Sequence, residues 1–93
     1  MKITWDEPKR LRNLETHAMD FESIHGFEWA SAILRPTHSG AQGGRRFKAI
    51  GFLEDDLITA VFSGLGSEAV SLISLRRASR AERLEYAEAQ TYP

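Results

Sequence analysis

Four arginines lie within eight residues near the carboxyl end of the chain: Arg76, Arg77, Arg80 and Arg83. The apolar run Val70 to Leu75 precedes them, so we expect a strand that leads directly into an arginine-rich helix. Each guanidinium can offer two parallel hydrogen bonds to phosphate oxygens, and four together suit a phosphodiester. The alternative is a solvated helix face with helical glutamates such as Glu82 as partners. That alternative fits Arg80 and Arg83 better than Arg76 and Arg77.

A second basic cluster consists of Arg45, Arg46 and Lys48. On a strand, Arg46 and Lys48 share one face and Arg45 points to the other. A neighbouring strand could bring the first two near Arg76. Charged residues that open a strand are usually just solvated, so this cluster is a weak signal when taken alone.

The three histidines are His17, His25 and His38. Their spacing matches no metal motif, and no carboxylate stands at a ligand interval, so we expect no bound metal and no cofactor. His17 ends a predicted helix, where its imidazole either satisfies free carbonyls or exchanges protons near neutral pH. His17 is therefore a candidate proton carrier.

Composition narrows the class of protein. The chain has 93 residues, 42% of them hydrophobic, which predicts one core and a single domain spanning residues 1–93. A formal net charge of -1 argues against a protein that coats nucleic acid by bulk charge. The absence of cysteine excludes disulfides, thiolate metal sites and cysteine nucleophiles. Without a membrane-length apolar run or a secretory signal, we expect a cytoplasmic protein that has no contact with a membrane.

The pattern predicts an α+β fold. Residues 2–5 form a short strand, and Asp6 begins a first helix whose buried stripe is Leu11, Leu14 and Ala18. Asp20 starts a second helix, although Gly26 leaves its end open. Strands at 46–53, 57–63 and 69–75 follow a loop at 36–44, which we expect to be mobile. We therefore expect a small antiparallel meander of about four strands, two N-terminal helices and one C-terminal helix.

The last helix should begin at Ser79, because Ser79-Arg80-Ala81-Glu82 is a capping box. Apolar residues occupy both alternation classes in the strands at 57–62 and 70–75, so both faces of the sheet need cover. Either the C-terminal helix covers the second face or a protein partner does.

Many residues of these elements together resemble the BrnT family. They are Ile3-Thr4-Trp5-Asp6, Lys9, Asn13, His17, Asp20-Phe21, Phe27, Trp29, Arg46-Phe47, Ile50-Gly51, Val61-Phe62, the run Ile73 to Ala78, Glu82 and Tyr86. The resemblance spans about residues 3 to 87, which is nearly the whole chain. It weighs more than any single motif.

The resemblance implies the toxin of a bacterial type II toxin-antitoxin pair, with a RelE-like ribonuclease fold. Such a toxin cuts RNA without a metal and so blocks translation. A BrnA-type antitoxin neutralises it, contacts DNA in its place to repress the operon, and allows a heterotetramer of the two proteins. The catalytic candidates are then Arg46, Arg76, Glu68 and His17, and the RNA-binding candidates are Lys9, Arg45, Lys48, Arg77 and Arg80.

Departures from the family pattern favour a second hypothesis. Leu65 and Ser71 stand where the family carries arginines, Gly44 where it carries an acidic residue, and Ala18 where it carries glycine. Loss of two phosphate-facing cations would weaken cleavage, because charge stabilisation is often the largest catalytic contribution. The alternative is therefore an inactive toxin homologue that still binds its antitoxin and helps it to repress.

Overall fold

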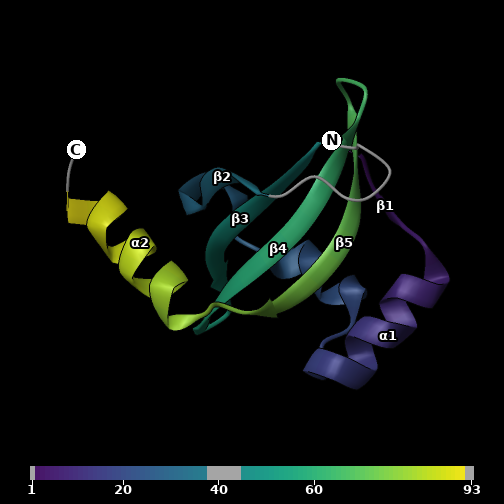
Figure 1. The fold of residues 1–93 in the computed structure, drawn as a ribbon, viewed down its shortest axis with the longest axis horizontal. Helices are drawn as coiled ribbons and strands as arrows, with labels where there is room; N and C mark the ends of the chain where they lie inside the picture. The colour runs from purple at the N-terminus through teal and green to yellow at the C-terminus, as the bar shows by residue number, and fades with distance from the viewer. Residues whose placement is uncertain (1, 38–44, 92–93) are drawn as a thin grey trace.

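Five strands form one mixed sheet in the computed structural model, which describes residues 2–37 and 45–91 (Figure 1). Their order across the sheet is β1-β5-β4-β3-β2. The strands are β1 (Lys2–Trp5), β2 (Ile33–Thr37), β3 (Arg46–Leu53), β4 (Asp56–Leu65) and β5 (Ala69–Arg77). The helices are α1 (Glu7–His17), the 3₁₀ helices η1 (Phe21–Gly26) and η2 (Trp29–Ser31), and α2 (Arg80–Thr91).

The predicted α+β class and the meander are confirmed, but the predicted number of strands is wrong. The strand that was not predicted is β2, which includes the first two residues of the expected loop at 36–44; residues 38–44 lie outside the described residues. Strands β2 to β5 pair antiparallel in sequence order, whereas β1 pairs in parallel with β5, with Thr4 opposite Ser71. Strand β1 has only four residues, too few for its sequence to indicate which strand it pairs with or in which direction. The observed architecture therefore matches neither the four strands that the pattern predicted nor the RelE-like fold that the resemblance implied.

The N-terminal helices also differ from expectation. The segment after Asp20 is a 3₁₀ helix, although Asp20 does cap it by accepting the Glu22 N–H at 3.0 Å. In α1 the expected buried stripe is wrong, because Leu11 and Leu14 are 53% and 40% exposed. The residue that α1 buries is Asn13, which faces β5. Polar contact with a strand backbone thus replaces the apolar packing that helical periodicity predicted.

The larger core lies between the sheet and the N-terminal segment. Buried residues of β3, β4 and β5 pack there against Phe21, Ile24 and Phe27. Figure 1 shows α1 beside β5, while α2 extends away at the other end of the molecule. This core fixes the strands whose opposite face carries the charged residues described below.

A smaller core lies on the α2 side of the sheet. It consists of Ile50, Leu57, Ala78 and Tyr86, and the Tyr86 ring meets Phe52 edge-on at 5.7 Å. These contacts cover the α2 side only near the end of β5 and the start of β4. Farther along, Val61, Ser63 and Ser71 are half-buried rather than buried. Of the helices that the structure describes, none has the length and apolar character needed to cross a membrane.

Candidate functional site

Three predicted cations lie on the α2 side of the sheet. Arg46 and Lys48 alternate with core residues along β3, and Arg76 lies two strands away on β5. The register places Arg46 in a row with Ser63 and Ser71, and Lys48 in the next row with Val61 and Ser74. Arg76 follows in the row of Thr59 and Ile50. We call this surface the cationic sheet face.

Glu82 of α2 connects two of these cations. Its carboxylate accepts hydrogen bonds from Arg76 Nη1 at 2.7 Å and Nη2 at 3.0 Å, and from Lys48 Nζ at 3.1 Å. Thr59 Oγ1 donates to it at 2.9 Å and the Ser79 N–H at 2.8 Å. Its side chain is only 5% exposed. One buried carboxylate therefore holds the side chains of Lys48 and Arg76 in fixed positions.

The titration of Glu82 reflects these donors. Burial by itself would raise the pKa of Glu82, because it disfavours the charged form. Hydrogen bonds from Arg76, the Ser79 N–H, Thr59 and Lys48 outweigh burial and hold the pKa of Glu82 far below its ordinary value. The same hydrogen bond raises the pKa of Arg76. Glu82 and Arg76 are therefore both charged at neutral pH.

The capping box at Ser79 is confirmed, but sequence reasoning missed the second role of Glu82. The Glu82 N–H donates to Ser79 Oγ at 3.2 Å, as the motif predicts. The interpretation that Arg76 fits a glutamate pairing poorly is wrong, since Arg76 and Glu82 are bidentate partners. The missed signal is the position of Thr59, a polar residue inside an apolar strand, which faces Arg76 across the β4–β5 pair.

The remaining carboxyl-terminal arginines lie outside this network. Arg77 is exposed and forms an ion pair with Asp56 at 3.3 Å. Arg80 is exposed on the first turn of α2. Arg45 precedes β3 and lines a cavity of about 220 Å³ with Pro36 and Thr37. The structure thus separates the four-arginine cluster: Arg76 pairs with the buried Glu82, whereas the other three arginines are exposed, and Arg77 pairs there with Asp56.

Glu68 lies far from Arg76 along β5. It stands in the turn that precedes β5, whereas Arg76 is the next-to-last residue of that strand. Eight residues of extended chain span about 26 Å. Glu68 is exposed, and its backbone carbonyl accepts the Lys2 N–H at 2.9 Å. The structure therefore does not bring Glu68 together with Arg76; the nearer predicted cation by register is Arg46, whose row includes Ser71.

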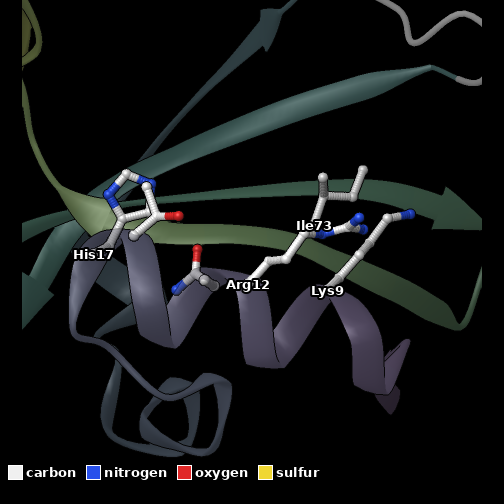
Figure 2. Close-up of a pocket in the computed structure, with 6 residues that line it drawn as sticks. Lys9, Arg12, His17 and Ile73 are labelled. Atoms are coloured by element: carbon white, nitrogen blue, oxygen red, sulfur yellow. The ribbon is translucent and has the colours of Figure 1, made fainter.

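Lys9 and His17 lie on α1 and line a cavity of about 260 Å³ with Arg12, Asn13, Thr16 and Ile73. Figure 2 shows Lys9 and Arg12 extending to the same side of the helix, alongside Ile73, with His17 at the other end of the row. His38 lies outside the described residues. His25 is exposed on η1 and contacts Glu22 at 3.7 Å.

Asn13 joins this cavity to β5. Its Nδ2 donates to the carbonyl oxygens of Leu75 and Met19 at 2.8 and 2.9 Å, and its Oδ1 accepts the Leu75 N–H at 3.0 Å. Ser74 Oγ also donates to Asn13 Oδ1, at 3.3 Å. The amide thus pairs with β5 as a neighbouring strand would, beyond the point where β1 ends. Sequence reasoning missed this role.

The cationic sheet face has the chemistry of an anion-binding surface. Arg46, Lys48 and Arg76 supply three positive charges and Glu82 one negative, which leaves a net charge of two. The side chains of Arg76 and Lys48 are 30% and 22% exposed, so both remain accessible from solvent. Such a surface can bind a phosphodiester and stabilise charge that develops on it.

Comparison with known proteins identifies the family of the chain. Residues 5–82 match the family described as ribonuclease toxin, BrnT, of type II toxin-antitoxin system. The fold is similar to the crystal structure of the Brucella abortus ribonuclease toxin BrnT, with a TM-score of 0.70 and 40% sequence identity. That match covers 86% of this chain and 99% of the Brucella chain. No curated protein matches the chain. The chain therefore belongs to the BrnT family of ribonuclease toxins of type II toxin-antitoxin systems.

Proposed function

We propose that this protein acts in the cytoplasm as a metal-independent endoribonuclease, and that it inhibits translation by cutting RNA. The observation that carries the proposal is the cationic sheet face, where Arg46, Lys48 and Arg76 gather on one partly open surface. A BrnA-type antitoxin neutralises the activity. The antitoxin supplies any contact with DNA, and toxin and antitoxin form a heterotetramer.

The proposed reaction is an internal transfer at phosphorus. A base removes the proton of a ribose 2′-hydroxyl, and the resulting oxygen attacks the adjacent phosphorus. The 5′-oxygen of the next nucleotide leaves after it receives a proton. Negative charge grows on the phosphoryl oxygens in the transition state, and Arg46 and Arg76 stabilise it. This route needs neither a metal ion nor an external water molecule.

Two side chains are candidates for the proton transfers. His17 follows Asn13 by one helical turn, and Asn13 contacts Leu75, the neighbour of Arg76. That placement favours His17 over Glu68 for chemistry at Arg76, because Glu68 lies at the opposite end of β5. If cleavage is centred on Arg46 instead, Glu68 is the candidate. The remaining predicted cations bind the RNA strand: Lys9, Arg45, Lys48, Arg77 and Arg80.

The test is cleavage of RNA by protein purified free of antitoxin, with and without a chelator. We expect cleavage that the chelator leaves unchanged and that Arg46→Ala slows by about 100-fold, the typical loss for one transition-state contact. Arg46 is a better target than Arg76, because removal of Arg76 would also deprive the buried Glu82 of its main partner. Arg83→Ala, on the exposed surface of α2, is the control for the loss of one charge.

The second candidate function is an inactive toxin homologue that binds its antitoxin and assists repression. Ser63 and Ser71, in the row of Arg46, contribute no charge, and Glu82 offsets one cation of the same surface. This function predicts intact RNA under all conditions, tight binding of the antitoxin, and bacterial growth that is unaffected when the protein is expressed alone. Any metal-independent cleavage that depends on Arg46 would rule it out.

A further inference from the structure

A groove between α1 and β5 contains two cations that the cationic sheet face does not use. Lys9 and Arg12 line it on the helix side and Ile73 on the strand side, and the cavity measures about 260 Å³. Figure 2 shows the Lys9 and Arg12 side chains extending together alongside Ile73. We call this feature the α1 groove.

The cations of α1 fall into two groups. Arg10 is held by Glu7 at 2.7 Å and by Asp20 at 3.0 Å, so it has a structural role. Among residues 2–37 and 45–91, none of the ion pairs includes Lys9 or Arg12. Two adjacent positive charges without an acidic partner in this part of the chain repel each other, and an anion bound between them would relieve that repulsion.

The α1 groove adjoins the cationic sheet face at the edge of β5. Ser74 belongs to the row of Lys48 and donates to Asn13, which itself lines the groove. Ile73 enters the groove because of a β-bulge: Val61 is paired with Ser74 and Phe62 with Leu72, which leaves Ile73 without a partner in β4. The bulge thus joins the two surfaces.

From these features we propose that the α1 groove is a second RNA subsite, which binds phosphate groups to one side of the cleaved bond. This inference rests on the proposed function. Lys9 and Arg12 bind the phosphates, and Ile73 contacts a base or ribose. From Lys9 to His17 the helix rises about 12 Å, longer than one phosphate group, so the groove suits a strand rather than a single ion. Its continuity with the sheet face favours RNA over an acidic peptide.

Binding can be tested independently of cleavage. The probe is a fluorescent single-stranded oligonucleotide with 2′-O-methyl groups, which lacks the attacking hydroxyl. We expect the double variant Lys9→Gln with Arg12→Gln to bind the oligonucleotide more weakly. The plot of log K against log salt concentration should also become less steep by about 1.4, because each phosphate contact on a single strand contributes about 0.7 to its steepness. The matched control is Lys2→Gln with Arg83→Gln, which removes one lysine and one arginine from exposed positions elsewhere.

A cleavage assay then places the subsite relative to the reaction. We expect the groove variant to cleave long RNA with a raised KM and a much smaller change in kcat, because Lys9 and Arg12 bind the strand and do not stabilise the transition state. Equal salt slopes for the groove variant and its control would overturn the inference. Unchanged RNA binding with weakened binding of the antitoxin would overturn it as well and assign the groove to a protein partner. If the wild type binds through the groove but cleaves nothing, the proposed activity fails and the subsite stands.

Discussion

Arg76 and Glu82 form a bidentate ion pair, with Nη1 to Oε1 at 2.7 Å and Nη2 to Oε2 at 3.0 Å, that connects the last strand to the last helix. The same carboxylate caps α2 through the Ser79 N–H and binds Lys48 of β3. The position of α2 and the geometry of the cationic sheet face therefore depend on one residue. A change at Glu82 should affect both.

Replacement of Glu82 by glutamine should destabilise the protein by about 3 kcal/mol. The substitution removes the negative charge from a buried ion pair and leaves the positive charges of Arg76 and Lys48 without a charged partner. Urea denaturation gives the free energy of unfolding. Glu85→Gln is the matched control on the same helix: its partner Arg35 is 41% exposed, and we expect a loss below about 1 kcal/mol. Equal losses in the two variants would contradict a special role for Glu82.

Acid should weaken the fold through the same carboxylate. The pKa of Glu82 is lower in the folded protein than in the unfolded chain, so the unfolded chain binds more protons in acid. The stabilisation is complete above the unfolded value of about 4.3 and is lost as the pH falls below it. Unfolding free energies measured between about pH 5 and pH 3 should fall steeply for the wild type and less steeply for Glu82→Gln. Parallel curves would show that other carboxylates cause the acid lability.

The site was predictable where local pattern determines structure. Ser79 and Glu82 stand three residues apart before a helix, and the capping box follows from that spacing alone. Arg46 and Lys48 share a face because strand side chains alternate. The shared carboxylate that joins Lys48 to Arg76 depends on the pairing of three strands and on the packing of α2, which sequence spacing does not encode.

The errors have the same origin. Leu11 and Leu14 have helical spacing, yet both are exposed. The reason is that α1 meets the sheet at the edge of β5, where the backbone N–H and C=O of Leu75 need a polar partner, and Asn13 supplies it. The parallel pairing of β1 with β5 is a long-range contact of a short strand. Neither feature has a signature within a few residues of sequence.

Asn13→Ala should destabilise the protein by about 3 kcal/mol, because the Leu75 N–H and C=O would remain buried without partners. Hydrogen exchange at the Leu75 amide should become faster, because the hydrogen bond from this N–H to Asn13 Oδ1 is lost. Glu15→Ala, on the exposed surface of the same helix, provides the control. Unchanged protection of the Leu75 amide would show that Asn13 does not hold this strand edge.

Gly51→Ala should cost about 1–3 kcal/mol through steric overlap in the core. A Cβ atom at position 51 would lie 2.9 Å from Cβ of Ala32 and 3.0 Å from the Phe27 ring. Gly64→Ala is the matched control on the next strand, because a Cβ atom there meets nothing within 4 Å. Thermal denaturation compares the two. Similar melting temperatures for both variants would contradict the tight contact at Gly51.

The Ser71→Arg variant should cleave RNA faster than the wild type. Ser71 lies in the row of Arg46, with Ser63 between them, so an arginine there adds a third guanidinium to the cationic sheet face. An additional cation near the transferred phosphoryl group stabilises the transition state, and we expect an increase in kcat of about 10-fold or more. The measurement is cleavage of one RNA substrate at saturating concentration in the presence of a chelator.

Ser67→Arg is the control for this gain, because it makes the same substitution in the exposed turn between β4 and β5, outside the rows of the sheet face. A gain specific to position 71 would mean that the missing arginine limits an otherwise competent site. Equal gains at both positions would reflect general attraction of RNA to added charge. No cleavage by either variant, with the fold and antitoxin binding intact, would favour the antitoxin-binding function over the enzyme, since the cationic sheet face would then lack more than one charge.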